Sequence, residues 1–377
     1  MKICILSNAH PSDDVRLYYK MARSLARIAQ VHLICRSGVR NRAANPHQIV
    51  VSSDTKWGSL FRIYRKARKI RPDIAICVEP LTILVGMALK RKYGTRLVFD
   101  VHEFYPDAFA ERFPAPFKWL MKNLYLGIER WLQARVDATI GVSDGILDQL
   151  VPSWQRDSAI TIPNYPVKNV WDYSCETPSD ISTLCEMNFD LIYIGGITVD
   201  RGIFKILKSA WLLKREFPSI SVLILGKFFS SDLEKQFNAY INSHNLNAIV
   251  YYQSWLPAEK IGLLLKRSKV GLWLFNPQNR RMRKAVPLKV LEYFAAGLPV
   301  VSINTPLMRE LVEQNGAGLC SEYQSDSIAK AVAGILGLKK PGYEAMSRRA
   351  ARLIEERYNW EALEPRLLDL VQKLAGE

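Results

Sequence analysis

Apolar runs typical of buried strands alternate with helical patterns from the start of the chain. The first part contains, in order, the runs KICIL, VHLIC, DIAICV, RLVFDV and ATIGV, with helical patterns over residues 14–28, 81–90 and 117–134. Near-continuous apolar strands separated by helices predict a parallel sheet that is covered by helices on both faces. We expect this first domain to comprise residues 1–170.

A second series of the same kind follows a polar interval. Residues 171–188 contain Ser, Thr, Asp and Pro without sustained periodicity, which predicts a linker. Beyond it the chain contains the runs FDLIYI, SVLILG, AIVYY and VGLWLF, with helical patterns over residues 202–217, 233–242 and 258–267. These patterns predict a second α/β domain over residues 189–357. Residues 358–377 have the amphipathic spacing of a terminal helix, which either closes a domain or crosses back onto the first one.

The length of the chain agrees with this division. A chain of 377 residues is too long for one ordinary core and suits two domains. In open α/β sheets, ligands bind at the carboxyl ends of the strands. We therefore predict two α/β domains that face each other across a cleft, with the functional site in that cleft.

Composition narrows the classes of protein without selecting one. Hydrophobic residues make up 49% and charged residues 23% of the chain, which argues against extended disorder. The formal net charge of +16 favours a polyanionic partner, and nucleic acid, an anionic lipid surface and a phosphorylated substrate all satisfy it. The six cysteines are scattered without a CxxC pair, and the five histidines lack metal-ligand spacing. We expect reduced thiols and no metal ion.

The hydrophobic pattern also bears on location. The apolar run in the N-terminal segment MKICILSNAH is too short for a signal peptide and is typical of a first strand. No run of about eighteen apolar residues occurs in the sequence. With the scattered cysteines, these features predict a cytoplasmic protein without a membrane-spanning segment.

The segment PLKVLEYFAAGLPVV, residues 287–301, joins a short helix to a buried strand. Pro287 suits a first helical position, and Gly297 suits the left-handed residue that ends a helix. An apolar stripe at helical spacing comprises Val290, Leu291, Phe294 and Ala295. Lys289 and Glu292 project from one face near the helix N-terminus, where they either hold a phosphate and a sugar hydroxyl or form a surface ion pair.

A glycine turn follows the strand LIYI. Gly195 and Gly196 permit a close backbone turn, and Arg201 precedes Gly202 at the start of a helix. Backbone N–H groups and a guanidinium in this arrangement suit a phosphate, although an ordinary tight turn with a solvated arginine has the same pattern. The turn is not GxGxxG, so a nicotinamide cofactor has little support.

Polar residues gather after two strands of the first domain. The strand RLVFDV leads into His102 and Glu103, and we place His102 beside the reacting centre, unless its own loop satisfies it. The first strand leads into His10, Asp14 and Arg16, which are candidates for contact with a hydroxylated acceptor. Asp14 has the alternative of capping the helix that follows.

The remaining candidates are one tryptophan and two basic clusters. Trp255 follows a strand and either lies near a nucleotide base or packs in the core. The first cluster comprises Arg62, Arg65, Lys66, Arg68, Lys69 and Arg71, and the second comprises Arg280, Arg281, Arg283 and Lys284. The first cluster, with the apolar segment FKWLMKNLYL, predicts weak peripheral association with anionic membranes, against the alternative of a solvated helix face. The second cluster is a candidate contact for phosphates or the donor group.

Five sequence features together resemble glycosyltransferase family 4 of the GT-B fold. They are the pattern PxKxxEYxAxGxPVV from Pro287, the glycine turn before Arg201, TIPN at residues 161–164, GVSDGI at residues 141–146, and Glu310 ahead of NGAG at residues 315–318. The resemblance covers nearly the whole chain. It implies two Rossmann-like domains, a nucleoside diphosphate sugar bound mainly by the second one, and transfer with retention of configuration and without a metal ion.

The resemblance also implies roles for individual residues. Arg201 and Lys289 would hold the donor pyrophosphate, and Glu292 would take the ribose hydroxyls. Backbone N–H groups near Leu307 could add phosphate contacts, and His102 would lie near the transferred sugar. The terminal helix near residue 360 would be the crossover helix of the family.

Two positions depart from the family pattern. Lys284 occupies the position where the family often has a second glutamate, and Gly196 occupies the position of a frequent arginine. Arg201 would then supply the positive charge at the turn. These departures leave the donor sugar open.

The sequence thus favours a hexosyltransferase that moves a sugar from a nucleoside diphosphate to a hydroxyl of a glycan or lipid-linked acceptor. Two alternatives remain, one from another class of protein and one within enzymes. One is a nucleic-acid-binding protein that uses its basic surface, although it has no recognisable module. The other is a nucleotide-sugar epimerase of the same fold. The donor base, the acceptor and the linkage are not predicted.

Overall fold

The chain forms two compact units in a computed structural model. The structure describes residues 1–38, 40–41, 44–53, 55–102, 105–110, 112–168, 184, 186–254, 256, 258–279 and 286–376. The first unit comprises residues 1–164 and 360–377, and the second comprises residues 165–359. The sequence predicts the first boundary at residue 170, and most of the predicted linker lies outside the described residues. None of the described helices combines the length and apolarity that a bilayer crossing requires.

The first unit is built on a seven-stranded parallel sheet with the order β3-β2-β1-β4-β5-β6-β7. The strands are β1 (Lys2–Pro11), β2 (Gln30–Ser37), β3 (His47–Val50), β4 (Ile74–Cys77), β5 (Arg96–Val101), β6 (Ala138–Gly141) and β7 (Ala159–Thr161). Every residue of β4 and β6 is buried, as the near-continuous apolar runs predict for strands covered on both faces.

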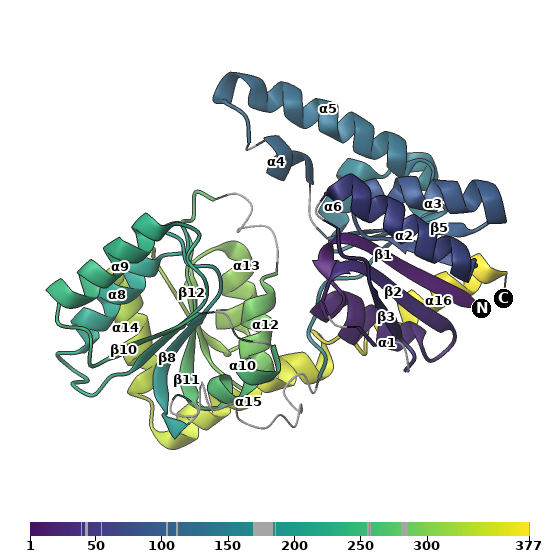
Figure 1. The fold of residues 1–377 in the computed structure, drawn as a ribbon. Coiled ribbons are helices and arrows are strands. Elements are labelled where there is room, and N and C mark those ends of the chain that lie inside the picture. Colours follow the sequence, from purple (N-terminus) through teal and green to yellow (C-terminus); the bar gives the residue numbers. More distant parts are fainter. Residues whose placement is uncertain are drawn as a thin grey trace. The chain divides into compact units, whose positions relative to one another are not determined.

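Helices cover both faces of this sheet. They are η1 (Val15–Ala22), α1 (Arg23–Leu25), α2 (Lys56–Ile70), α3 (Pro80–Tyr93), α4 (Tyr105–Ala110), α5 (Ala115–Gln133), α6 (Asp144–Leu150), η2 (Ser153–Ser158) and α16 (Glu364–Ala375). Helices α2, α3 and α5 lie on one side of the sheet, and α1 and α16 lie on the other (Figure 1).

The second unit repeats the same topology. Its six parallel strands have the order β10-β9-β8-β11-β12-β13. They are β8 (Phe189–Ile194), β9 (Val222–Leu225), β10 (Val250–Gln253), β11 (Ser268–Trp273), β12 (Val300–Ile303) and β13 (Gly318–Ser321). The helices are α8 (Ile203–Leu213), α9 (Ser231–Ser243), α10 (Ala258–Lys266), α12 (Leu288–Ala295), α13 (Pro306–Met308), η3 (Arg309–Gln314), α14 (Ser325–Leu336) and α15 (Lys340–Glu356).

The strand order of each unit confirms the prediction of two parallel Rossmann-like domains. In both sheets the strand order reverses beside the first strand of the unit, between β1 and β4 and between β8 and β11. At such a reversal the loops after the two neighbouring strands run to opposite faces of the sheet, which leaves a crevice at the carboxyl ends of the strands. Ligands of open α/β sheets bind in this crevice. The carboxyl edge of each sheet is therefore a candidate ligand edge.

The terminal segment packs on the first unit. The indole Nε1 of Trp360 donates a hydrogen bond of 2.9 Å to Ser24 Oγ, and Arg27 Nη1 lies 2.7 Å from Glu364 Oε2.

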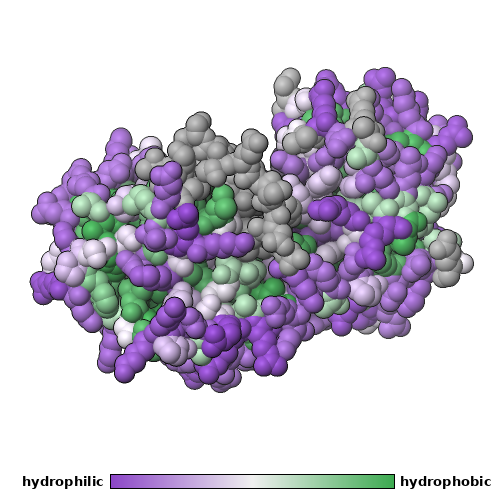
Figure 2. Space-filling view, turned by 90° about the horizontal axis from the view of Figure 1, so that it is seen from below, coloured by the Kyte–Doolittle hydropathy of each residue, from purple (hydrophilic) through white to green (hydrophobic). Residues whose placement is uncertain are grey.

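Figure 2 shows a surface on which hydrophilic residues predominate and hydrophobic side chains form scattered areas. Cys4, Cys35, Cys77 and Cys320, the cysteines within the described residues, form no disulfide.

Two local predictions were wrong in detail. The pattern over residues 14–28 predicts an ordinary α-helix, but the structure forms the wider π-helix η1 before the short α1. Pro287 is the residue before α12 rather than its first helical residue, because its ψ of 121° is extended. The short strands β3, β7 and β13 lacked a hydrophobic period long enough to predict them.

A buried carboxyl group in α5 makes the stability of the first unit depend on pH. Glu129 is 1% exposed, its Oε2 has no hydrogen-bond partner among the described residues, and burial raises its pKa to about 8. Because this folded-state pKa exceeds the ordinary value of 4.5, stability is present below pH 4.5 and is lost as pH rises through about 8. We expect Glu129→Gln to be more stable than wild type by roughly 2 to 4 kcal/mol at pH 8 and equal to it at pH 4.

Urea denaturation between pH 4 and pH 8.5 measures this difference. Glu234→Gln, a change of the same type on the exposed surface of α9, is the matched control. Equal stability of Glu129→Gln and wild type at pH 8 would show that Glu129 is hydrated and charged.

Candidate active site

Glu79, which follows β4, binds the carboxyl-terminal part of β1. Its Oε1 accepts hydrogen bonds from Ser7 Oγ (2.5 Å) and Ala9 N (3.1 Å), and its Oε2 accepts one from Asn8 N (2.9 Å). Glu79 is 6% exposed. Its carboxylate therefore fixes the backbone that leads to His10, at the point where the strand order reverses. The sequence prediction missed Glu79, although a carboxylate directly after a buried strand is the same signal that singled out His102 and its neighbours.

His10, Asp14 and His102 come together at this edge. Asp14 Oδ1 accepts hydrogen bonds from the backbone N–H groups of Arg16 (2.9 Å) and Leu17 (3.0 Å), and Asp14 Oδ2 lies 3.3 Å from His10 Nδ1. The ring centroids of His10 and His102 are 5.2 Å apart, edge to face. Burial alone would raise the pKa of Asp14, but the hydrogen bonds from His10 and Leu17 outweigh it and lower that pKa. Asp14 thus caps η1 and also orients a site residue.

A buried ion pair supports His102. Arg16 donates to Asp100 through Nε (3.1 Å) and Nη2 (2.7 Å), and through Nη1 to the carbonyl of Ile162 (3.1 Å). His102 Nε2 lies 2.5 Å from Asp100 Oδ2. Burial alone would raise the pKa of Asp100, but Arg16 and His102 hold it well below its usual range. Arg16 is 3% exposed, so it positions Asp100 instead of contacting an acceptor, which corrects the sequence prediction.

The TIPN sequence at residues 161–164 has a structural role in the same network. Its Ile162 carbonyl accepts from Arg16, and Asn164 Oδ1 accepts a hydrogen bond of 2.6 Å from Lys20 Nζ. Lys20 is 1% exposed and was not predicted. Because Arg16 and Lys20 lie one turn apart on η1, the TIPN segment supplies oxygens to two buried cations.

In the second unit, the glycine turn after β8 is a close backbone approach. Gly226, directly after β9, lies against this turn. A Cβ atom at Gly226 would lie 1.8 Å from the carbonyl oxygen of Gly195, so only glycine fits at position 226. Gly195 has a φ of +149°, and Gly202, with a φ of +73°, precedes α8. Arg201 Nη1 donates to the Gly196 carbonyl at 3.4 Å. Arg201 therefore lies against the turn.

The ring of Phe229 lies beside Gly196. A Cβ atom at position 196 would lie 2.4 Å from this ring, but the Phe229 side chain is 76% exposed and can move aside, so the contact does not by itself require glycine. The hydroxyl of Tyr193 donates to the Gly196 carbonyl at 2.9 Å, and burial raises the pKa of Tyr193 to about 12. A phenyl ring and a buried tyrosine hydroxyl thus lie beside this turn.

Helix α12 carries the predicted lysine and glutamate. Lys289 Nζ lies 2.7 Å from Glu292 Oε2, and the side chains are 28% and 13% exposed. Gly297 has a φ of +68°, which confirms the left-handed residue after the helix. The predicted apolar stripe is also confirmed, since Val290, Leu291 and Phe294 are fully buried and Ala295 is partly buried. The side chains of Lys289 and Glu292 stay partly accessible, so they can pair with each other and still contact a ligand.

Tyr293, in the second turn of α12, ties this helix to the carboxyl end of β8. Its hydroxyl accepts a hydrogen bond of 2.9 Å from Ile194 N and donates one of 3.3 Å to the Leu272 carbonyl. Its ring lies over Gly271, where a Cβ atom would come within 2.6 Å. Ile194 directly precedes the glycine turn, so Tyr293 links α12 to that turn. The sequence motif contained Tyr293, but no role was predicted for it.

Leu307 lies at the carboxyl end of β12, the strand next to β11. It is partly buried in the three-residue helix α13, where Thr305 Oγ1 accepts from Met308 N at 3.3 Å.

The side chains of Glu103, Trp255, Lys284 and the rest of the second basic cluster lie outside the described residues. Among the residues that are described, no three His, Cys, Asp or Glu side chains lie close enough to hold a metal ion.

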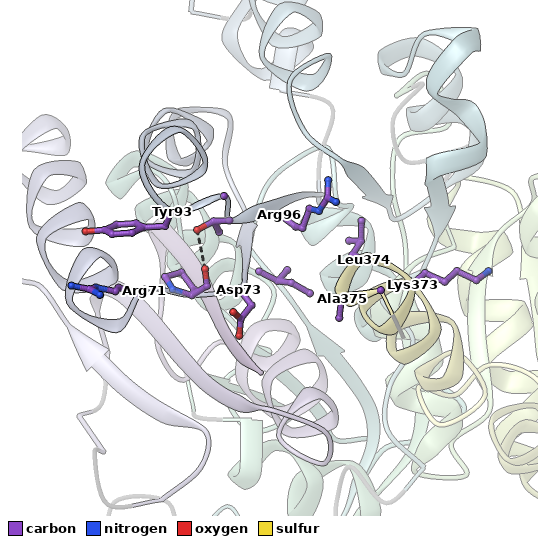
Figure 3. A pocket seen from close by; sticks show the side chains of 12 residues that line it. Arg71, Asp73, Tyr93, Arg96, Lys373, Leu374 and Ala375 are labelled. Carbon is purple, nitrogen blue, oxygen red and sulfur yellow. Dashed lines mark hydrogen bonds between the residues drawn. The ribbon is translucent and has the colours of Figure 1, made fainter.

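A cavity of about 440 Å³ lies away from these groups (Figure 3). Its lining includes Arg71, Asp73, Tyr93, Arg96 and Lys373, from the segments before β4 and β5 and from α16. These segments form the amino edge of the first sheet, opposite to His102. The cavity is therefore not part of the candidate site.

The fold defines a two-domain α/β protein, and its second unit carries Arg201, Lys289 and Glu292 on segments that follow the carboxyl ends of parallel strands. Two family models match the chain, Glycosyltransferase Family 4 over residues 15–165 and Glycosyl transferases group 1 over residues 179–360. The chain belongs to glycosyltransferase family 4, and its fold is GT-B.

Individual relatives are distant. Chitobiosyldiphosphodolichol beta-mannosyltransferase of Debaryomyces hansenii is 26% identical over 31% of this chain and 24% of its own length. UDP-glycosyltransferase TURAN of Arabidopsis thaliana is 25% identical over 39% of this chain and 32% of its own length. The matches thus span about a quarter to a third of these relatives. The structure of Anabaena HepE in complex with UDP and glucose has a TM-score of 0.71 at 15% identity, covering 99% of this chain and 100% of that one.

Proposed function

We propose that this chain is a retaining, metal-independent hexosyltransferase that moves a sugar from a nucleoside diphosphate to a hydroxyl of a glycan or lipid-linked acceptor, in polysaccharide or glycolipid biosynthesis. One observation carries the proposal. Arg201 lies against the glycine turn after β8, and Tyr293 ties the helix of Lys289 and Glu292 to the same turn. These groups gather two cations and one carboxylate at the ligand edge of a Rossmann-like sheet.

The donor side follows from these charges. Arg201 and Lys289 would bind the diphosphate, since a guanidinium and an ammonium both pair with phosphate oxygens. Glu292 would accept hydrogen bonds from the ribose hydroxyls. HepE was solved with UDP and glucose, and TURAN is named a UDP-glycosyltransferase, which makes a uridine diphosphate sugar the first donor to test.

The reaction breaks the bond between the anomeric carbon and the diphosphate oxygen and forms a bond from that carbon to the acceptor oxygen. The sugar ring gains positive charge in the transition state, the diphosphate leaves with negative charge, and the acceptor proton passes to the leaving diphosphate. Arg201 and Lys289 would stabilise the negative charge, and a preorganised group of this kind is typically worth about 3 to 4 kcal/mol.

On the acceptor side, His102 would position the transferred sugar. Its Nε2 is engaged by Asp100, so contact with the sugar falls to Nδ1 or to the backbone carbonyl. His10, oriented by Asp14, would contact the acceptor hydroxyl. The mannosyltransferase relative is named for a lipid diphosphate-linked acceptor, which supports a lipid-linked substrate class. We also propose a cytoplasmic protein that contacts an anionic membrane peripherally.

We expect a nucleoside diphosphate sugar to raise the melting temperature of the full chain and to be hydrolysed slowly without an acceptor. At about 100 times its Kd, the donor adds about 2.7 kcal/mol of stability. A thermal-shift screen of nucleotide sugars, followed by an assay of released nucleoside diphosphate with and without EDTA, measures both. Hydrolysis that EDTA abolishes would contradict metal independence, and an inverted product in proton NMR would contradict retention.

The same screen separates the alternatives. If no nucleotide sugar binds while DNA or RNA binds tightly at physiological salt, the chain is a nucleic-acid-binding protein. If a nucleotide sugar is converted to its epimer without an acceptor, the chain is an epimerase.

A further inference from the structure

Helix α5 exposes an apolar stripe along its length. The stripe residues recur every three or four positions and so share one helix face; they are Phe117, Leu120, Leu124, Ile128 and Trp131. Each of the five side chains is between 51% and 55% exposed. Exposed apolar surface that is contiguous along a helix marks an interaction site more often than isolated apolar residues do.

The opposite side of α5 provides its attachment to the first unit. The ring of Tyr125 packs on Phe109 of α4, with the centroids 4.7 Å apart. Leu132 and Gln133 are buried, and Arg130 donates to the carbonyl of Gln149. The stripe is therefore not needed to hold α5 in place, and it is available to a partner.

The helices around the stripe are strongly basic. Helices α2, α3 and α5 carry six, three and three lysine and arginine residues, respectively. Within these three helices, all of them described, the one acidic residue is Glu129, which is buried. All three lie on the same side of the sheet (Figure 1). Trp57 and Phe61 of α2, 68% and 62% exposed, add apolar surface among the cations.

The direction of α5 connects the stripe to the candidate site. The chain passes from His102 through α4 into α5, and α5 leads back to the start of β6. The N-terminal end of α5 consequently lies toward the carboxyl edge of the sheet, where His102 and His10 lie. Trp119, near this end, is 74% exposed.

We propose that the α5 stripe inserts into the headgroup region of an anionic bilayer, while the lysines and arginines of α2, α3 and α5 bind the lipid phosphates. A helix with an apolar face and surrounding cations binds membranes in this way. A second copy of the chain fits poorly, because each copy has a net charge of +16. This surface specifies the membrane contact named in the proposed function and is independent of the transfer chemistry.

Vesicle co-sedimentation of the full chain tests this surface. We expect binding to vesicles of phosphatidylcholine with phosphatidylglycerol, much weaker binding to phosphatidylcholine alone, and a loss of binding when salt rises from about 0.1 M to about 0.5 M. Leu124→Asp combined with Ile128→Asp should weaken binding at least tenfold, because two apolar side chains are removed from the lipid contact. Leu338→Asp, at an exposed leucine of the second unit, should bind as wild type does.

A matched pair of charge variants tests the cations. Arg65→Glu with Lys66→Glu in α2 should also weaken binding at least tenfold, whereas Lys235→Glu with Lys340→Glu, at exposed positions of the second unit, should have a clearly smaller effect. UDP binding, measured by calorimetry, should be the same in all variants. If wild type does not bind UDP, the donor is not a uridine diphosphate sugar, and the result does not bear on the membrane contact.

Three results would overturn the bilayer contact. They are equal sedimentation with neutral and anionic vesicles, unchanged binding of the Leu124 and Ile128 variant, and a dimer in sedimentation equilibrium that this variant dissociates. Brominated lipid provides a test on wild type alone, since insertion predicts quenching of tryptophan fluorescence. Absence of quenching would also overturn insertion, whether or not the variants fold.

Discussion

Replacing Lys289 with alanine is expected to lower kcat for sugar transfer by about 10²- to 10³-fold, because one preorganised positive charge at the departing diphosphate is lost. The free energy of unfolding should change by about 1 kcal/mol or less, since the Lys289–Glu292 pair is partly exposed, at 28% and 13%. The rate of nucleoside diphosphate release, together with a melting curve, measures the two effects separately.

Lys208→Ala is the matched control for this experiment. Lys208 is an exposed lysine on α8 in the same unit, and its removal should leave kcat unchanged. Lys289→Arg keeps the charge and should retain more activity than Lys289→Ala. If Lys289→Ala transfers sugar at the wild-type rate, α12 does not bind the diphosphate and the donor assignment is wrong.

Replacing Asp100 with alanine is expected to lower the free energy of unfolding by about 3 to 5 kcal/mol. The carboxylate of Asp100 is fully buried and receives two hydrogen bonds from Arg16, which is itself 3% exposed. Without it a guanidinium remains buried with the Ile162 carbonyl as its other described partner, and His102 loses the oxygen that orients its ring. Urea denaturation measures the loss.

The pH dependence gives this prediction a second measurement. The folded-state pKa of Asp100 lies well below its ordinary value, so its stabilisation is present above about pH 4 and is lost as pH falls. The wild type should lose this part of its stability in acid, and Asp100→Asn should not. Asp148→Ala, which breaks an exposed ion pair with Arg156, should change stability by about 0.5 kcal/mol or less. A similarly small loss for Asp100→Ala would mean that water replaces the carboxylate.

Local chemistry explains which parts of the site were predictable. The glycine turn, the left-handed Gly297 and the cap at Asp14 each depend on the backbone of a few neighbouring residues. Lys289 and Glu292 share a helix face because they are three residues apart. Features of this range can be predicted from spacing alone.

The supporting contacts of the site were not predictable in the same way. Glu79 binds Ser7 of β1 across 72 positions of sequence, and Arg16 pairs with Asp100 across 84. No local pattern encodes such pairs, because they depend on which strands become neighbours in the sheet. For the same reason Arg16 looked accessible in the sequence and is buried in the structure.

By itself, the sequence determined that this protein has two parallel α/β domains of a glycosyltransferase family, because strand and helix periods and the family pattern are properties of short segments. The tertiary structure decided between the two placements that the pattern left open for the segment from Trp360, which belongs to the first unit, and it alone decided which face of α5 remains uncovered. Both depend on burial of apolar surface between segments distant in the chain. An amphipathic helix has the same pattern whether its apolar face meets the core or the solvent.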